Sequence, residues 1–322
     1  MSEDGARMKR VLIDTDIGSD IDDALALLLA IHLKDVEILG ITTVYGPTEL
    51  RAKIARKIVA AAGLNTPVAA GASEPMLSLM PVWTAGTEGE GILTKDEIEA
   101  PLDMFNVIDD ATSLIMDQVM THPKEVTLVA LGALTNVAKA LESSPHLIDD
   151  LKEIVFMGGG LTYPQSLPPT LFSGQSYRAR HSHNILCDMA AASRVLQSGV
   201  PMRVVTNDAT CRYWLEGHAI DRFRQTKVPH VRLVGRMLDV WLRYRSALFS
   251  EPIAGTCPHD CFAMAVAVNR VPYKSASGVL NVEPDDASTE FLLKKESHLE
   301  IVFAEDGDAF LPWLGERLHT PD

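Results

Sequence analysis

The stretch VLIDTDIGSDIDDALALLLA, residues 11–30, decides the fold expected of this chain. It opens with the apolar segment Val11–Ile13, which is typical of a buried strand, and it closes with the apolar run Ala24–Ala30. Five carboxylates lie between the two within ten positions, namely Asp14, Asp16, Asp20, Asp22 and Asp23. Burying this much negative charge at the end of a strand requires a compensating partner.

Helix capping explains only part of this acidity. Ser19 or Asp20 at the N-cap would leave the next two acids in the first helical turn, where the helix dipole favours negative charge. It does not explain Asp14 and Asp16, which precede that turn. Anions this close repel, and burial would protonate some of them unless a cation is present. A hard divalent cation with oxygen ligands is therefore favoured over an acid–base pair without metal.

Short β-rich segments alternate with helical patterns along the chain. Strands are predicted for Val11–Ile13, Ile38–Val44, Val126–Leu131, Ile154–Met157 and Met202–Thr206. Helices are predicted for Arg51–Ala62, Asn106–Met120, Leu134–Leu141 and Ala190–Leu196. The alternation predicts an α/β fold with a Rossmann-like, mostly parallel central sheet flanked by helices. We expect one domain over residues 1–322, with elaborated loops at about 72–99 and 161–180 and a ligand site outside the carboxyl ends of the strands.

A second acidic point lies far along the chain, in the segment CPHDC at residues 257–261. His259 and Asp260 stand directly before the apolar run Phe262–Val268, which reads as a buried helix. Taken alone, an N-cap aspartate beside an incidental histidine explains the pair. Together with the acidic loop, the pair becomes a candidate for a further metal ligand and a proton donor.

Composition excludes several classes of partner. The chain has 29 Lys and Arg against 43 Asp and Glu, and its formal net charge of −14 argues against nucleic acid as the main partner. The longest uncharged apolar run is too short to span a bilayer, and the N-terminus has no apolar signal region. We therefore expect a soluble, cytoplasmic protein without a membrane partner. Four cysteines in 322 residues do not make a disulfide framework.

Six segments, in order, share a pattern with a known family. They are DTDIGSDIDDA at 14–24, TTVYG at 42–46, TLVALGALTN at 127–136, MGGG at 157–160, HNILCD at 183–188 and HD at 259–260. On these residues the chain resembles the nucleoside hydrolases of the inosine–uridine-preferring type. The resemblance implies the nucleoside hydrolase fold and hydrolysis of the N-glycosidic bond of a ribonucleoside or related N-riboside, which gives free base and ribose.

The resemblance also implies a set of residue roles. A Ca²⁺ at the bottom of the pocket would be bound by Asp16, Asp23, Asp260 and the backbone carbonyl of Leu131. Asp16 would also be the general base that takes a proton from water, and Asp22 would bind a ribose hydroxyl. Asn184 would contact the ribose near its 5′ end or ring oxygen, and His259 would face the leaving base and protonate it. The habit of the family is a homodimer or homotetramer.

The chain departs from the family pattern inside this site. Two extra residues put the two expected loop ligands seven positions apart rather than five, and they make Asp20 a rival of Asp22 for the ribose-facing role. Pro47 and Ser182 replace an Asn and a Glu that typical members use on the ribose. The diol and metal end is thus retained while the 5′ and base ends differ, so the substrate need not be a standard nucleoside.

Two alternatives stay open. A catalytically weak, calcium-dependent riboside-binding protein would keep the diol site without rapid turnover. A haloacid-dehalogenase-type phosphatase is suggested by Leu12–Asp16 and by Glu305–Asp308, but it leaves the pair at 259–260 unexplained. The helix that carries Trp241 and Tyr244 is either core with solvated arginines or an aromatic wall that stacks on a planar base.

Overall fold

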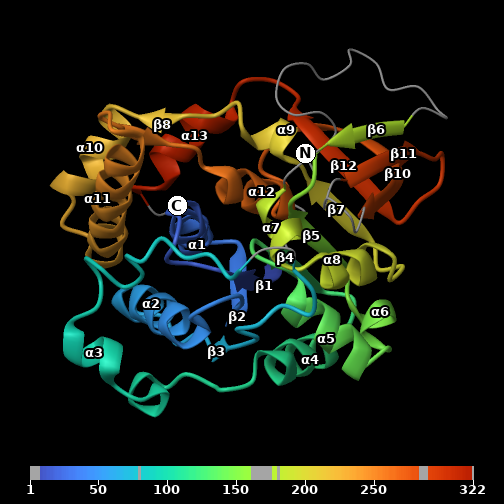
Figure 1. The fold of residues 1–322 in the computed structure, drawn as a ribbon, viewed down its shortest axis with the longest axis horizontal. Coiled ribbons are helices and arrows are strands. Elements are labelled where there is room, and N and C mark those ends of the chain that lie inside the picture. Colours follow the sequence, from blue (N-terminus) through green and yellow to red (C-terminus); the bar gives the residue numbers. More distant parts are fainter. Residues whose placement is uncertain (1–7, 79–80, 161–175, 180–181, 283–288, 321–322) are drawn as a thin grey trace, which may run out of the picture.

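Figure 1 shows a twisted central sheet with helices on both of its faces. The computed structural model of the protein describes residues 8–78, 81–160, 176–179, 182–282 and 289–320. Within these ranges, ten strands join in the order β3-β2-β1-β4-β5-β7-β12-β10-β11-β6. Their bounds are β1 Lys9–Thr15, β2 Val36–Thr43, β3 Val68–Ala70, β4 Val126–Ala130, β5 Glu153–Met157, β6 Ser176–Ala179, β7 Met202–Val205, β10 Tyr273–Val282, β11 Thr289–Leu293 and β12 Leu299–Glu305.

The strands from β3 to β12 in this order are parallel, as the sequence predicts. β10, β11 and β6 extend the sheet with antiparallel pairings, which the sequence did not predict. A separate antiparallel pair, β8 Leu215–Glu216 with β9 Gly255–Thr256, lies outside the main sheet. The predicted α/β fold with a mostly parallel sheet is therefore confirmed, and one edge of the sheet is antiparallel.

Helices cover both faces of the sheet. Their bounds are α1 Asp22–His32, α2 Thr48–Ala61, α3 Lys95–Glu99, α4 Ala111–Thr121, α5 Thr135–Ser143, α6 Leu147–Asp150, α7 His183–Cys187, α8 Met189–Leu196, α9 Asn207–Thr210, α10 His218–Gln225, α11 Pro229–Phe249, α12 His259–Ala267 and α13 Phe310–Arg317, with a 3₁₀ turn η1 at Leu102–Phe105. Successive side chains of a strand point to opposite faces. Val11 and Ile13 of β1 accordingly pack in the core with α1, α2, α11 and α12, whereas Leu12 packs in the core with α4, α5 and α8.

Each of the predicted strands is confirmed to within two residues, and most helix predictions are close. The prediction for Asn106–Met120 is wrong at its start, because α4 begins only at Ala111. The Asp110 side chain caps the helix there by accepting a hydrogen bond from the Ser113 N–H at 2.9 Å. The predicted loop at 72–99 contains α3, and of the loop at 161–180 the structure describes only β6.

No helix in the described ranges combines the length and the apolar character that crossing a membrane requires.

A buried pair of histidines joins α1 to α11. The Nε2 atoms of His32 and His230 lie 2.8 Å apart, and His32 Nδ1 lies 2.7 Å from the backbone carbonyl oxygen of Arg317 in α13. One ring must donate the shared hydrogen and the other must accept it, so the two rings cannot both be protonated. Desolvation and the nearby His32 lower the pKa of His230.

Acid should weaken this contact between the helices. The pKa of His230 is lower in the folded protein than its ordinary value of 6.5, so below that pH the unfolded chain takes up the proton first. The stabilisation that this histidine contributes is therefore complete above about pH 6.5 and falls as the pH is lowered. Denaturant unfolding should show that the free energy of unfolding falls more between pH 7.5 and pH 5.5 in the wild type than in His230→Gln, whose new side chain does not titrate. Equal losses in the two proteins would contradict this role.

Candidate active site

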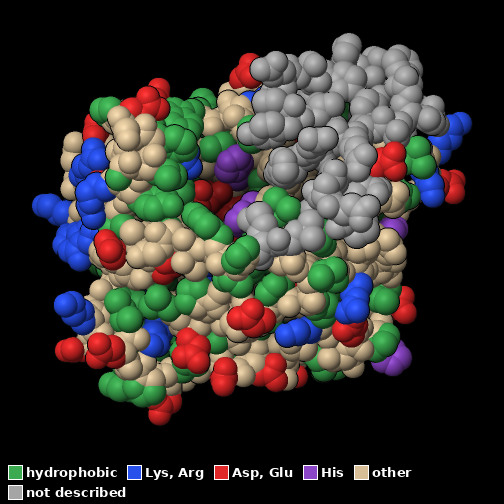
Figure 2. Space-filling model, in the orientation of Figure 1, with side chains coloured by type: hydrophobic (Ala, Val, Ile, Leu, Met, Phe, Trp, Pro, Cys, Tyr) green, Lys and Arg blue, Asp and Glu red, His purple; other side chains and the backbone are tan. Residues whose placement is uncertain are grey.

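A cavity of about 490 Å³ opens at the carboxyl edge of the parallel strands. Asp16, Leu131, Met157 and Asn207 line it, and these residues end or follow β1, β4, β5 and β7. Figure 2 shows acidic and histidine side chains together in a hollow of the surface. The cavity thus lies where ligands bind in open α/β sheets, as expected from the sequence.

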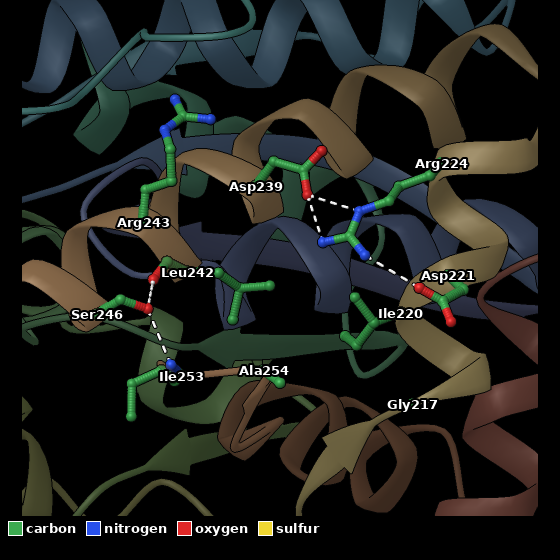
Figure 3. Close-up of a pocket in the computed structure, with 10 residues that line it drawn as sticks. All are labelled: Gly217, Ile220, Asp221, Arg224, Asp239, Leu242, Arg243, Ser246, Ile253 and Ala254. Atoms are coloured by element: carbon green, nitrogen blue, oxygen red, sulfur yellow. Dashed lines mark hydrogen bonds and ion pairs between the residues drawn. The ribbon is translucent and has the colours of Figure 1, made fainter. Parts of the chain in front are cut away.

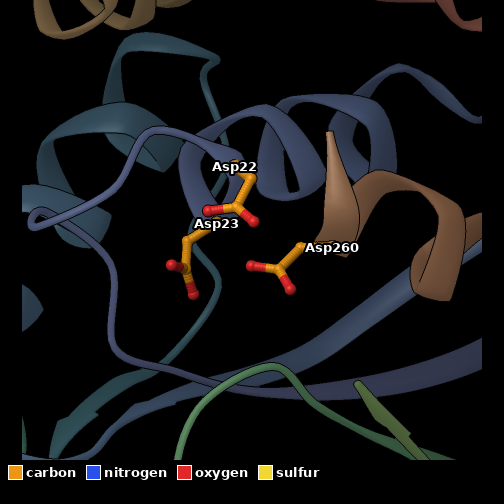
Figure 4. Close-up of side chains that lie close together, drawn as sticks. All are labelled: Asp22, Asp23 and Asp260. Carbon is orange, nitrogen blue, oxygen red and sulfur yellow. The ribbon is translucent and has the colours of Figure 1, made fainter. Parts of the chain in front are cut away.

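Three carboxylates converge in this cavity. Asp22 and Asp23 stand in the first turn of α1 and Asp260 in the first turn of α12, and each offers an oxygen within 4.8 Å of the others (Figure 4). The positive ends of both helix dipoles favour negative charge there. Even so, burial and mutual repulsion raise the pKa of all three carboxyl groups well above the ordinary value. Buried oxygens that repel one another suit a hard divalent cation.

Asp16 lies beside this cluster and against the end of β4. It lines the cavity, and a Cβ at position 132 would lie 3.0 Å from Asp16 Oδ1, so Gly132 makes room for the carboxylate. Its charge contributes to the raised pKa of Asp22, Asp23 and Asp260. Within the described part of the chain, the close group of three acids does not include Asp16. Its roles as ligand and base therefore stay predictions.

Asn184 contacts the carbonyl group that the resemblance assigns to the metal. Its Nδ2 donates to the backbone oxygens of Leu131 at 2.5 Å and Met157 at 2.9 Å. Ser182, just before α7, also lines the cavity, and its Oγ accepts a hydrogen bond from the Gly159 N–H at 2.7 Å. The segment after β6 is thus tied directly to the ends of β4 and β5.

A fully buried arginine in α2 holds the acidic loop in place. Arg51 donates from Nε to the Tyr45 carbonyl at 2.8 Å and from Nη2 to Ser19 Oγ at 3.1 Å. Its Nη1 donates to the carbonyl of Ile17 at 3.0 Å and to that of Asp16. One guanidinium therefore fixes both the loop after β1 and the turn after β2.

The two-residue insertion forms part of this loop and does not lengthen the helix. α1 begins at Asp22 with Ile21 at its N-cap and no side-chain cap. The prediction that Ser19 or Asp20 caps the helix is wrong, because the Ser19 hydroxyl donates to Glu88 Oε1 at 2.6 Å instead. The loop that contains the insertion is thus anchored through Ser19 to the loop at 72–99.

Asp20 remains a rival of Asp22 for the ribose, since both line the cavity. Asp20 Oδ1 accepts a hydrogen bond from the Ile21 N–H at 2.5 Å, and burial raises the pKa of Asp20 to about 7.

Gly18 makes the preceding turn at a φ of +118°, where a Cβ would lie 2.8 Å from Ile54 Cδ1. Only glycine suits this backbone conformation so close to a neighbour.

His259 is oriented at the cavity by Thr210. Its Nδ1 lies 2.7 Å from Thr210 Oγ1, so among the described residues Nε2 is the ring nitrogen left for a ligand. Desolvation and the charge of Arg245 lower the pKa of His259 to about 4. The ring is thus neutral at pH 7. The role of His259 as proton donor to the leaving base stays a prediction, and the proton would have to come from the N–H of a neutral imidazole.

Aromatic side chains from two elements form walls of the cavity. Trp83, in the loop before α3, meets the His183 ring edge to face at 5.6 Å. α11 contributes Trp241 and Tyr244, whose rings stack with their centroids 5.5 Å apart. The aromatic side chains of α11 therefore line the cavity. This position supports the prediction that they form an aromatic wall of the pocket.

Two more aspartates support the site from behind. Asp14 accepts hydrogen bonds from Thr42 Oγ1 at 2.6 Å and Asn136 Nδ2 at 2.8 Å, and burial raises its pKa to about 7. Asp188 caps α8 by accepting a hydrogen bond from the Ala191 N–H at 3.1 Å. Asp14 thus joins the end of β1 to β2 and α5, and Asp188 joins α8 to the loop at 72–99, since it also accepts a hydrogen bond from the Met76 N–H at 2.7 Å.

A second cavity, of about 600 Å³, lies between α10 and α11. Arg224 reaches Asp221 at 3.0 Å and Asp239 at 2.9 Å across it, as Figure 3 shows. These exposed ion pairs join three of its four charged side chains, and none of the predicted site residues lines it. The smaller cavity at the strand ends therefore carries the candidate active site.

Sequence reasoning missed Arg51, Trp83 and Arg245 as parts of the site. Arg51 shares a helical face with the buried Ile54 and Ile58, and a charge at such a position was the available signal. Trp83 lies in an irregular loop without any pattern to point to it. Arg245 was read as a solvated charge, although it follows Trp241 by one helical turn.

The comparisons with known proteins agree with this geometry. The family model described as inosine-uridine preferring nucleoside hydrolase matches residues 11–311. The chain is 31% identical to the inosine-uridine preferring nucleoside hydrolase of Crithidia fasciculata over 81% of this chain and 79% of that protein. It is 27% identical to the pyrimidine-specific ribonucleoside hydrolase RihA of Salmonella typhimurium over 96% of this chain and 97% of that protein. The structure of the purine-preferring ribonucleoside hydrolase from Gardnerella vaginalis superposes with a TM-score of 0.76 at 23% identity over 97% and 98% of the two chains.

The chain belongs to the inosine-uridine preferring nucleoside hydrolase family. It is accordingly an N-ribohydrolase, an enzyme that hydrolyses ribonucleosides to base and ribose. Membership removes the phosphatase alternative. The family is metal-dependent, and the acidic cluster gives this chain a place for the metal.

Removal of the Arg51 guanidinium should both destabilise the protein and loosen the acidic loop. Arg51→Met leaves buried carbonyl groups without donors, so the free energy of unfolding should fall by about 3–5 kcal/mol. Denaturant unfolding measures this loss. Arg56→Met, on the partly exposed side of the same helix, is the matched control and should cost less than about 1 kcal/mol. Similar losses for the two variants would show that Arg51 does not hold the loop.

Proposed function

We propose that this enzyme hydrolyses the N-glycosidic bond of a ribonucleoside or related N-riboside with Ca²⁺ in the cavity at the strand ends. The proposal rests on one observation above all, the close group of buried carboxylates at the N-termini of α1 and α12. Its donors are all oxygen atoms, which suit Ca²⁺ and not a soft metal. Their raised pKa values mean that they are costly to ionise until a cation is present.

The Ca²⁺ would be bound by Asp23, Asp260, Asp16 and the backbone carbonyl of Leu131. Asp22 lies close enough either to bind the ion as well or to contact the ribose. Bound there, the ion would fix the ribose 2′- and 3′-hydroxyls and make a nearby water easier to ionise. Asp22 or Asp20 would accept a hydrogen bond from a ribose hydroxyl. Asn184 would contact the ribose on the side of α7.

In the reaction, the bond from C1′ to the base nitrogen breaks and its electron pair stays with the base. Asp16 takes a proton from the attacking water, whose oxygen bonds to C1′. The carboxylates around the sugar stabilise the positive charge that develops on it. The side chains of Trp83, Trp241 and Tyr244 would surround a planar base and exclude water from it.

The proposal leaves the substrate within this class open. The relatives are named for inosine and uridine, for pyrimidine or for purine ribonucleosides, so their names do not select one base. Ser182 and Pro47 remove ribose contacts typical of the family, which supports a substrate with an altered 5′ end. The single domain, a homodimer or homotetramer and a cytoplasmic location remain expectations of the sequence.

Ca²⁺ should stabilise the folded protein. A ligand that binds only the folded state raises the melting temperature in proportion to the logarithm of its concentration above Kd. We expect a rise with Ca²⁺, little response to Mg²⁺ at equal concentration, and reversal by a chelator, all measured by differential scanning fluorimetry. Asp260→Asn should lose the response, and Asp221→Asn, in the other cavity, should keep it. A response of the Asp260 variant equal to the wild type would place the ion elsewhere.

Asp16→Asn should lower kcat by about 10²–10⁴-fold, because the amide cannot take the proton from water. Ribose released from a nucleoside panel, with and without chelator, is the measurement, and Asp221→Asn is again the control. Calcium-dependent binding of nucleosides without ribose release would support the weak riboside-binding alternative. Undiminished turnover in Asp16→Asn would rule out this residue as the base.

A further inference from the structure

One charge in the cavity has no part in the function proposed above. Arg245 is the only Lys or Arg among the described residues that line the cavity. It lies on α11 beside Tyr244 and one helical turn from Trp241 and Leu248, and all four face the cavity. A lone cation among acidic and aromatic side chains needs an explanation.

Two aromatic rings hold the Arg245 side chain in one position. Its guanidinium carbon lies 5.2 Å from the centre of the Trp241 ring and 4.8 Å from that of Phe249. These residues are four positions before and four after it, so they stand above and below it on the same helix. Stacking of this kind fixes the plane of the guanidinium and leaves its N–H edge free to donate.

One donor on that edge lacks a partner among the described residues. The Nε atom of Arg245 is buried, and no described residue offers it a hydrogen-bond acceptor. Among the described residues no carboxylate forms an ion pair with the guanidinium, although Asp20 stands near enough for the charge of Arg245 to act on it. A buried donor without an acceptor is costly, and such groups are commonly completed by a ligand.

The position of Arg245 selects the base end of the substrate as that ligand. Its guanidinium stacks on Trp241, part of the aromatic wall that would surround the base, whereas in the proposed function α1, α12 and α7 hold the ribose end. Guanidinium donates only, and it matches two neighbouring acceptors such as a carbonyl oxygen and a ring nitrogen. An amino group in place of that oxygen is itself a hydrogen-bond donor, so it could not accept the hydrogen bond that Arg245 offers.

We propose that Arg245 is a catalytic and specificity-determining residue that binds the leaving base and stabilises the negative charge on it. The inference rests on the proposed function. As the C1′–N bond breaks, its electron pair moves onto the base, and Arg245 donates hydrogen bonds to the resulting anion. Water supplies the hydroxyl group to C1′ and its proton to Asp16, and the departed base takes a proton from solvent. Bases with an oxygen acceptor on this edge are preferred over amino bases.

The test compares two leaving groups in the calcium-loaded enzyme. The nucleoside is inosine, or uridine if it is turned over faster, and its departing base must be stabilised as an anion. By contrast, p-nitrophenyl β-D-ribofuranoside releases an anion that is already stable. Arg245→Met keeps a linear side chain between the two rings and removes the charge. We expect kcat for the nucleoside to fall about 10²-fold, the nitrophenyl riboside to change less than about 3-fold, and Arg245→Lys to lie between.

Arg243→Met is the matched control, because Arg243 is exposed on the same helix and lines the other cavity. It should leave both substrates unchanged. The ratio of inosine to adenosine turnover should also fall in Arg245→Met, since the donor that separates the two bases is lost. Equal losses on the nucleoside and the nitrophenyl riboside would overturn the inference and assign Arg245 to balancing Asp20. Failure of the wild type to release ribose from any riboside would instead overturn the proposed function, and the inference with it.

Discussion

Desolvated negative charge at the strand ends is the constraint on which this structure depends. Asp22, Asp23 and Asp260 are brought together by two helices that pack side by side. The protein answers the repulsion with two helix N-termini and with Arg51, whose charge acts to lower the pKa of Asp23. These devices do not suffice, since the pKa values still stand well above normal. In the proposed function a resident cation completes the balance, and the loop that Arg51 holds contributes ligands to it.

The cavity divides into two halves with different physical characters. The acidic half is built from the most buried elements of the core, α1 and α12, in which nearly every side chain is covered. The aromatic half is built from α11 and the loop at 72–99, which meet across the opening. In the proposed function, the closely packed acidic half holds the reacting sugar in place, and the aromatic half accepts the base and releases it.

Much of the fold could be predicted because the central strands are short apolar runs and the helices between them have clear periodicity. β10 could not, because Tyr273–Val282 carries Lys, Ser and Gly and is half-exposed along much of its length. Two of the three clustered acids, Asp22 and Asp23, could be found from the charge density of one loop, whereas Asp260 was found only by considering the separate segment at 257–261 together with that loop. Arg51 and Arg245 could not be assigned, because their roles depend on which turns and rings meet them in space, and a single arginine in a helix does not reveal its acceptors.

The pocket face of α11 has a consequence for how such an enzyme can change. Trp241, Tyr244, Arg245 and Leu248 reach the cavity from one helix that supplies none of the clustered acids. The His32–His230 contact anchors this helix to α1 well away from that face. In the proposed function, substitutions at Trp241, Tyr244 and Leu248 can therefore reshape the base-binding wall while Arg245 and the sugar-binding machinery stay intact. New specificity can evolve along a single helix turn by turn, and a combinatorial library confined to these three positions would sample leaving groups without sacrificing the chemistry.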